Sequence, residues 1–358
     1  MSSNIAQNIS NAIPPVIKNA VPGFVKKFYR EVFYGPPASP SYKINGTHSF
    51  RKERLLMEKL HKTGERFIPT VLDFPPTIRI ETTTRCNLTC THCPNSVLSD
   101  VEGFLEDIDT GVYKKIIDEV AKEAPHIRVR PFGGGEPLFR KDMEDLIRYA
   151  HEKGLTNLSL NTNGTLLVKS RRKKLIEGGL NHIEVSIDAA TPETYLKIRQ
   201  SKLFNRLVEN TLSYIEEAKA HDSDNKIDVS FVYQKDNQHE LEMFQEFWTG
   251  KADVVLIRDY HQHNNLVDDH GRHNQQSFKY RHPCPYLWDR FIIHTNGLVK
   301  FCEYDWKGEH ILGDIRKNTI KEIWQGENFR KLRQMHVDGT FDYPYCKNCV
   351  DWAEPKWW

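Results

Sequence analysis

Between residues 77 and 260, short apolar segments of the chain alternate with longer amphipathic segments. The short segments predict strands at Thr77–Glu81, Ile127–Pro131, Asn157–Asn161, His182–Ile187, Lys226–Tyr233 and Asp253–Arg258. In the longer segments apolar residues recur every three or four positions, which predicts helices at Val112–Lys122, Lys141–Glu152, Arg171–Glu177 and Arg206–Ala220. This alternation predicts an α/β fold of parallel strands joined by right-handed crossovers, with ligands bound where the strands end.

The segments on either side of this region have a different character. Residues 1–75 form an N-terminal extension in which Ile17, Val21 and Phe24 share one face of a short basic helix, expected to pack on the main domain rather than on a membrane surface. Residues 261–282 are a polar linker expected to cover the substrate, and residues 283–358 form a small α+β module. In that module Asn296-Gly297 predicts a hairpin turn, and a helix is expected near Thr319–Met335.

Composition and charge restrict the class of protein. The chain has 358 residues, of which 39% are hydrophobic and 27% charged, as in folded soluble proteins. A net charge of +2 gives no bulk attraction to nucleic acid, so no nucleic-acid partner is expected. No apolar run is long enough to span a bilayer, and residues 1–11 lack the pattern of a secretory signal. We therefore expect a cytoplasmic protein without membrane association.

Seven cysteines fall into a group of three and a group of four. An odd number of cysteines in a chain that is not exported argues for metal ligation or catalysis rather than disulfides. Cys86, Cys90 and Cys93 have the spacing C-x3-C-x2-C, directly after the first predicted strand. Three thiolates on one loop can ligate three irons of a cubane cluster and leave the fourth open. A structural zinc ion would need a fourth ligand, for which His92 is the one nearby candidate.

This cysteine loop resembles the signature of the radical S-adenosylmethionine (SAM) enzymes, whose fold is a partial (β/α)6 barrel. The resemblance covers residues 77–260. It implies that the three cysteines hold a [4Fe–4S] cluster whose open iron binds the amine and carboxylate of SAM. Gly133-Gly134-Gly135-Glu136-Pro137, after the second strand, resembles the family's glycine-glycine-glutamate motif, which holds the SAM amine.

Further positions match the family in strand order. Asn161-Thr-Asn163-Gly164 ends the third strand, and Val185-Ser186-Ile187-Asp188 ends the fourth. Arg199 resembles the arginine that pairs with the SAM carboxylate, and His92 lies where an aromatic residue usually approaches the adenine. The resemblance thus implies the following SAM-binding residues: His92, Gly134, Gly135, Glu136, Asn163, Ser186, Asp188 and Arg199.

The second cysteine group has the pattern Cys284-x17-Cys302-x43-Cys346-x2-Cys349. On spacing alone a zinc ribbon is a serious alternative. A module of this form after a radical SAM barrel resembles the SPASM and twitch extensions, which hold auxiliary iron–sulfur clusters. Four cysteines match the shorter, twitch-like arrangement, with one auxiliary [4Fe–4S] cluster that all four thiolates ligate. Such a cluster is suited to electron transfer.

The resemblance implies that reductive cleavage of SAM gives a 5′-deoxyadenosyl radical, which takes hydrogen from an unreactive C–H bond. We expect oxidation of an alcohol on a carbohydrate, aminocyclitol or sugar nucleotide, with an electron passed to the auxiliary cluster. A flavodoxin or ferredoxin would be the external electron donor. The reaction needs a base, and Asp259 or His261, beside Arg258 at the end of the sixth strand, is the expected catalytic group.

Three alternatives remain open. A maturase that modifies a ribosomally made peptide is the first. A sugar epimerase is the second, although it usually needs a thiol to return hydrogen and the two clusters use all seven cysteines. A metal-stabilised binding scaffold without activity is the third, and a set of SAM-binding motifs would be superfluous there.

Overall fold

The computed structural model describes residues 71–221, 225–260, 263, 266–268, 281, 283–347 and 349. All of them belong to one compact unit, Tyr42–Trp357. Residues 1–70, and with them the predicted basic helix, lie outside the described residues, as does most of the polar linker 261–282. In the part of the chain that is described, no helix is long and apolar enough to cross a bilayer.

All six predicted strands are present, most of them displaced or shortened by one or two residues. They are β1 (Thr77–Ile80), β2 (Arg128–Arg130), β3 (Ser159–Thr162), β4 (His182–Ser186), β5 (Lys226–Tyr233) and β6 (Val254–Asp259). β1 pairs with β2, and β3 to β6 pair in sequence order, all of them parallel. A parallel bridge from Val129 to Leu158 joins the two sets. The strands thus follow the order of a partial (β/α)6 barrel.

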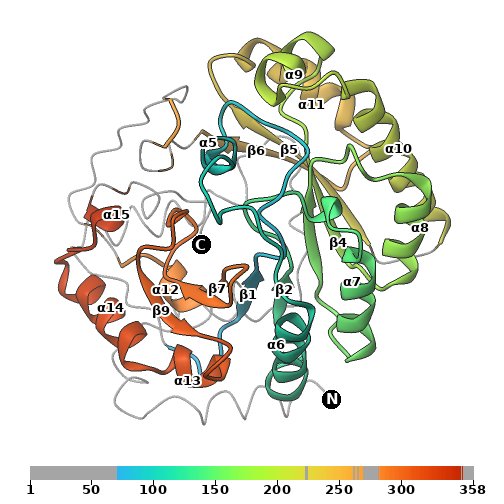
Figure 1. Ribbon diagram of the computed structural model, residues 1–358. Helices are drawn as coiled ribbons and strands as arrows, with labels where there is room; N and C mark the ends of the chain where they lie inside the picture. Colours follow the sequence, from blue (N-terminus) through green and yellow to red (C-terminus); the bar gives the residue numbers. More distant parts are fainter. Residues whose placement is uncertain are drawn as a thin grey trace, which may run out of the picture. The chain divides into compact units, whose positions relative to one another are not determined.

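The crossover helices cover the outer side of these strands (Figure 1). The predicted helices are confirmed as α6 (Thr110–Glu123), α7 (Met143–Glu152), α8 (Lys169–Glu177) and α10 (Phe204–Ala220). Sequence periodicity missed α5 (Pro94–Leu98), α9 (Pro192–Arg199) and α11 (Leu241–Trp248), each of eight residues or fewer. The Thr191 side chain accepts a hydrogen bond from Thr194 N and so begins α9. This helix carries Arg199 to the site.

Polar and apolar residues alternate along the strands, and this alternation sets the character of the barrel interior. Ile78 and Ile80 of β1 are fully buried in the core that the strands share with the outer helices. The residues between and after them, Arg79 and Glu81, lie on the opposite face because side chains alternate along a strand. β4 follows the same rule, with Ile183 in the core and Glu184 on the inner face. The inner face of the barrel is therefore polar and charged.

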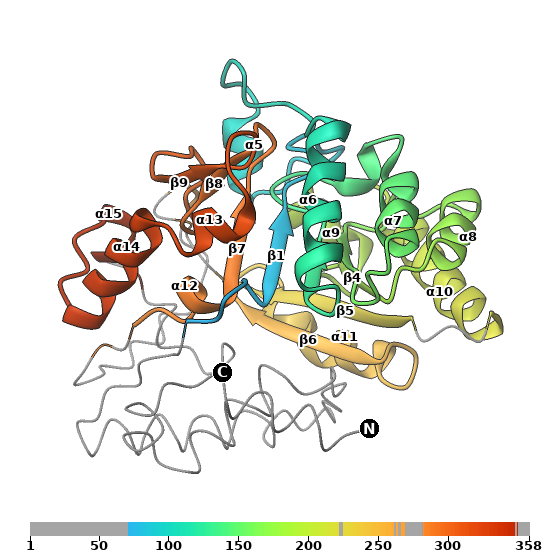
Figure 2. The ribbon, with the colours of Figure 1, turned by 90° about the horizontal axis from the view of Figure 1, so that it is seen from below.

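The C-terminal segment continues the sheet of the barrel. After α12 (Tyr286–Asp289), β7 (Arg290–Ile293) pairs in parallel with β1 from Thr77 to Ile80 (Figure 2). β7, β8 (Leu298–Lys300) and β9 (Ile311–Asp314) then pair antiparallel, which gives the strand order β2-β1-β7-β8-β9. The predicted hairpin is confirmed, with Gly297 at φ 81° in its turn. The segment that bears the second cysteine group therefore lies directly against β1.

The prediction of a single helix at Thr319–Met335 is wrong. The structure has α13 (Ile320–Trp324) and α14 (Glu327–Asp338), followed by α15 (Pro344–Lys347). Gly326 stands between α13 and α14 in an extended conformation, φ −71° and ψ 169°, as the N-cap of α14. The break also lets the Trp324 indole and the Gln325 amide both donate to the carbonyl of Leu72, at 2.8 and 2.7 Å. Periodicity continues across such a break, because both helices bury the same side.

Candidate active site

The loop that carries Cys86, Cys90 and Cys93 begins after β1 and is fixed to the neighbouring strand ends. Asn87 donates to Thr165 Oγ1 and accepts from the Asn163 amide, both at 2.9 Å. At the other end of the loop, the backbone N–H of Thr91 donates to the Ile198 carbonyl at 2.9 Å. The loop is therefore held by β3 on one side and α9 on the other.

The three thiols form a buried group. Burial, then the charge of Glu136 and the other two cysteines, raises the pKa of Cys86 to about 12. Burial and the nearby Cys90 likewise raise the pKa of Cys93 to about 12. The protein by itself therefore does not stabilise thiolates at this loop. A bound metal does so, because it replaces the proton on each ligand. The donor set suits an iron–sulfur cluster.

Glu136 is fixed at the carboxyl end of β3. One carboxylate oxygen accepts from Thr162 Oγ1 at 2.6 Å and from Leu138 N at 3.0 Å. The other accepts from Asn163 N at 2.6 Å. These donors orient the carboxylate, although burial dominates and raises its pKa above the ordinary value. An ammonium group near this carboxylate would favour its ionised form.

The glycines before Glu136 are required by close packing. A Cβ on Gly135 would lie 2.5 Å from the carbonyl oxygen of Arg85, which immediately precedes Cys86. A Cβ on Gly133 would lie 2.2 Å from Glu81 Cγ, and one on Gly134 would lie 2.5 Å from Trp306. The sequence suggested that these glycines admit a ligand. In the structure they also admit the cysteine loop.

Asp188 joins three of the predicted SAM-binding positions. It has φ 65°, is fully buried, and pairs with Arg199 Nη2 at 2.6 Å and His92 Nε2 at 3.5 Å. Arg199 Nη1 lies 3.6 Å from Cys90 Sγ. Burial outweighs these contacts and raises the pKa of Asp188. The fold thus brings His92, Asp188, Arg199 and the first cysteine group together from separate segments.

Ser186 and Asn163 complete the set at neighbouring strand ends. Ser186 Oγ donates to Asn161 Oδ1 at 3.0 Å, and Ser230 Oγ donates to Ser186 Oγ at 3.4 Å. Asn163 Oδ1 accepts from Thr165 N and Thr165 Oγ1, at 3.0 and 2.6 Å. Both residues lie at the carboxyl ends of the strands, as predicted.

The structure describes the side chain of only one of the three predicted catalytic residues at the end of β6, Arg258. Arg258 Nη2 pairs with Glu184 Oε2 at 2.7 Å, and this carboxylate raises the pKa of Arg258. Arg258 therefore stays cationic and cannot accept a proton. Asp259 belongs to β6, but its side chain lies outside the described part of the structure, and so does His261.

Sequence reasoning missed Glu81, His294 and Lys300. Glu81 and Lys300 line a small hollow, together with Arg79, Gly133, Gly134, Ile292, Glu303 and Trp306. Glu81 accepts from Gly134 N at 2.7 Å and pairs with His294 Nε2 at 3.2 Å and Lys300 Nζ at 3.6 Å. Burial opposes ionisation of Glu81, but Lys300 and His294 hold its pKa below the ordinary value. The sequence signal that could have identified Glu81 as a site residue was its position directly after β1.

The second cysteine group is also assembled. Burial, then Cys349 and Cys284, raises the pKa of Cys302 well above its ordinary value. His336 contacts both ends of the group, because its Nδ1 accepts from Cys284 N at 3.2 Å and its Nε2 lies 3.4 Å from Cys346 Sγ. Among the described residues, no three His, Cys, Asp or Glu side chains surround one point as a single metal ion requires. Four thiolates are a donor set that can hold an iron–sulfur cluster.

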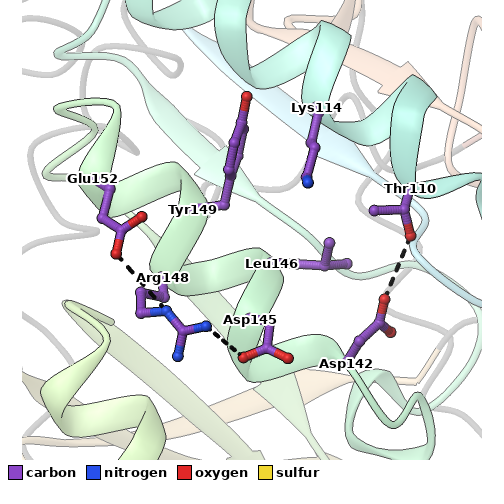
Figure 3. A pocket seen from close by; sticks show the side chains of 8 residues that line it. All are labelled: Thr110, Lys114, Asp142, Asp145, Leu146, Arg148, Tyr149 and Glu152. Carbon is purple, nitrogen blue, oxygen red and sulfur yellow. Dashed lines mark hydrogen bonds and ion pairs between the residues drawn. The ribbon is translucent and has the colours of Figure 1, made fainter.

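A second hollow lies on the outer surface between α6 and α7 (Figure 3). Within it Arg148 pairs with Asp145 at 2.7 Å, and Thr110 Oγ1 donates a hydrogen bond to Asp142 at 3.4 Å. It contains none of the predicted site residues.

Two family models match the chain. The radical SAM superfamily matches residues 80–247, and the iron–sulfur cluster-binding SPASM domain matches residues 284–350. The chain is thus a member of the radical SAM superfamily with a C-terminal SPASM domain. Its cofactors are SAM, a SAM-binding [4Fe–4S] cluster and an auxiliary iron–sulfur cluster. The zinc-ribbon alternative is thereby replaced.

Individual proteins are similar over different lengths. The tungsten-containing aldehyde ferredoxin oxidoreductase cofactor-modifying protein of Pyrococcus furiosus is 25% identical over 323 residues, 75% of this chain and 86% of that protein. PqqA peptide cyclase of Bradyrhizobium diazoefficiens is 36% identical over 132 residues, 37% of this chain and 32% of the cyclase. For several curated relatives the match spans about a third of their own length. The crystal structure of BtrN with AdoMet and 2-DOIA shares the fold, with a TM-score of 0.54 and 19% identity over 80% of this chain and 95% of BtrN.

Proposed function

We propose that this enzyme is an oxidoreductase that converts an alcohol of a polar small molecule into a ketone. One observation carries the proposal. Lys300 and Glu303, which flank Cys302, line the same hollow as Gly134 of the glycine motif. The hollow has a volume of about 20 Å³, so a substrate would reach into it with one polar group and would lie between the SAM-binding motif and a ligand of the auxiliary cluster. Cys86, Cys90 and Cys93 would hold the SAM-binding cluster, and Cys284, Cys302, Cys346 and Cys349 the auxiliary one.

When bound, SAM and the two clusters supply a radical that takes one hydrogen atom from the carbinol carbon and an acceptor for one electron. The hydroxyl proton must also leave, and its loss makes the carbinol-carbon radical strongly reducing, so that the electron passes to the acceptor and the C–O bond becomes a double bond. That proton needs a base, and Glu81 is the base in this proposal. Its carboxylate lines the hollow and is kept ionised by Lys300 and His294. Arg258 is not a base here, because Glu184 holds it as a cation.

The inner face of the barrel supports a polar substrate. Barrels of parallel strands usually fill their interior with branched apolar side chains. Here polar side chains contact one another between strands, as His182 Nε2 does with Asp228 Oδ2 at 2.7 Å and Ser186 with Asn161 at 3.0 Å. Such a surface would hydrogen-bond a sugar, an aminocyclitol or a sugar nucleotide. Peptide modification is the second candidate, because a peptide cyclase is 36% identical over 132 residues.

The first test is the number of clusters. Anaerobically reconstituted wild type should hold about eight irons, and a variant with Cys86→Ala, Cys90→Ala and Cys93→Ala about four, with an EPR signal remaining. A variant that keeps no iron and binds zinc instead would contradict the auxiliary iron–sulfur site.

The second test is the reaction. Alcohols deuterated at the carbinol carbon should transfer deuterium to 5′-deoxyadenosine and give a ketone. Cys90→Ala should abolish SAM cleavage, whereas Cys349→Ala should retain some cleavage and lose the ketone. Equal ketone formation in Cys349→Ala and wild type would refute the electron-acceptor role. Deuterium transfer with a cross-linked peptide as product would favour the second candidate.

A further inference from the structure

Four arginines gather on the inner face of the barrel from separate strands. They are Arg79 of β1, Arg130 of β2, Arg258 of β6 and Arg290 of β7. Strand pairing places Arg79 directly beside Arg130 in register. The two guanidinium groups lie over the ring of Phe132, at 5.0 and 4.7 Å from its centroid. This is an unusual concentration of positive charge for a protein interior.

Three of the arginines have carboxylate partners. Glu303 pairs with Arg79 at 2.6 Å and also with Arg290. Asp289 lies 3.6 Å from Arg290, and Glu184 pairs with Arg258 at 2.7 Å. The acidic partners Glu303, Asp289 and Glu184 are thereby engaged by Arg79, Arg290 and Arg258.

Arg130 is the exception. Arg130 lies close enough to Glu303 and Glu184 to interact electrostatically with both carboxylates. It forms an ion pair with neither in the described structure. Its Nε is buried and has no hydrogen-bond partner among the described residues. The contact with Phe132 is an attraction to a ring face and supplies no counter-charge. Of these four arginines, Arg130 is the one that forms no ion pair in the described structure.

We propose that Arg130 binds an oxyanion of the substrate, a carboxylate or a phosphate. The planar guanidinium offers two parallel N–H donors that match either group. Arg79, its neighbour in register, lines the hollow that contains Glu81 and Gly134. An anion at Arg130 would therefore orient the rest of the substrate toward that hollow. This inference rests on the proposed function only in placing the substrate inside the barrel.

A purely structural role for Arg130 makes the opposite prediction about stability. A buried cation with a partner stabilises the fold, and its removal costs stability. Arg130 is half-buried, and its Nε has lost its hydration without gaining a hydrogen bond, so replacement of Arg130 by an apolar residue of similar length should stabilise the ligand-free protein. The two roles are therefore separated by the sign of the change in Tm.

The experiment compares wild type, Arg130→Met and Arg148→Met by thermal unfolding in inorganic phosphate and in acetate. Arg148 is an exposed arginine of α7 that pairs with Asp145 and Glu152 on the outer surface (Figure 3), so it controls for the change in net charge. We expect anion to raise the Tm of wild type and Arg148→Met. Arg130→Met should start from a higher Tm and bind the anion about 10- to 100-fold more weakly. The anion that raises the Tm of wild type more, inorganic phosphate or acetate, identifies the substrate group as a phosphate or a carboxylate.

Three results would overturn the inference. They are an anion response that Arg130→Met retains, a wild type that responds to neither probe, and a Tm of anion-free Arg130→Met below that of wild type. If Arg130→Met does not fold, Arg130→Lys replaces it in the experiment. Arg130→Lys should bind the anion measurably but more weakly than wild type, because lysine keeps the positive charge and lacks the planar pair of N–H donors. Probe binding is measured without SAM or turnover. A failure to find alcohol oxidation therefore leaves this result intact, and loss of anion binding leaves the proposed oxidation to its own test.

Discussion

His336 Nε2 lies 3.4 Å from Cys346 Sγ, and the other ring nitrogen fixes the position of its proton. Because His336 Nδ1 accepts the backbone N–H of Cys284 at 3.2 Å, the ring must carry its proton on Nε2. His336 is almost fully buried, at 1% exposure, and burial lowers its pKa to about 3, so the ring is neutral. Nε2–H therefore points a hydrogen bond at a cysteine of the auxiliary-cluster domain.

This hydrogen bond should set the reduction potential of the auxiliary cluster. A donor to a ligating sulfur stabilises the reduced, more negative form of the cluster and raises its potential. We expect His336→Phe to lower the midpoint potential by on the order of 100 mV, which is the value of about one hydrogen bond to a charged group in a one-electron couple. His336→Gln keeps an N–H donor and is the matched control. An EPR-monitored redox titration measures both, and an unchanged potential in His336→Phe with iron content intact would contradict the assignment.

The second prediction concerns Gly135. A methyl group there would meet the Arg85 carbonyl at 2.5 Å and the Thr83 carbonyl at 2.6 Å, and backbone atoms cannot turn aside. Gly135→Ala should therefore displace the loop that carries Cys86, and about half of the reconstituted iron should be lost. Gly111→Ala, in the first turn of α6, is the control, because its Cβ meets only the Asp109 carboxylate at 3.0 Å. Full iron content in Gly135→Ala would show that the loop tolerates the shift.

The cysteine spacing, the glycine motif and the strand pattern depend on local sequence, and they predicted the barrel and a set of residues that the fold brings together at the strand ends. The contacts of Glu81 could not be predicted in this way. Glu81 follows β1, whereas its partners His294 and Lys300 stand more than 200 residues later. They meet because β7 pairs with β1, and a parallel pairing across such a distance leaves no periodicity in the sequence. The same pairing makes Arg290 a neighbour of the barrel interior.

Arg258 provides the third prediction, because its pairing with Glu184 makes it structural. Arg258→Gln would leave Glu184 buried without its main partner, which should cost about 3 kcal/mol of unfolding free energy at pH 7. Arg258→Lys keeps a positive charge and should cost less. In wild type, Arg258 offsets burial and holds the pKa of Glu184 low. Without it burial prevails and raises that pKa above its unfolded value, so the deficit of Arg258→Gln should shrink as the pH falls from 7 toward 5. Denaturant unfolding at both pH values measures this, and a deficit that grows at pH 5 would contradict it.

Replacement of Lys300 tests whether Glu81 is the base. Lys300 and His294 together hold the pKa of Glu81 below its ordinary value against the effect of burial. Burial lowers the pKa of His294, so Lys300 is the main charge that acts on Glu81. Replacing Lys300 by Met removes that charge, so the pKa of Glu81 should rise and the carboxylate should begin to protonate at a higher pH. A base works only when ionised, and the acidic limb of the ketone-forming rate should therefore move to higher pH in Lys300→Met.

Formation of 5′-deoxyadenosine precedes deprotonation in the proposed sequence and should keep the wild-type pH profile. Glu81→Gln should retain that first step and lose ketone at every pH. If Lys300→Met leaves the acidic limb unmoved while Glu81→Gln still makes ketone, the base is another group, and Asp259 becomes the next residue to replace.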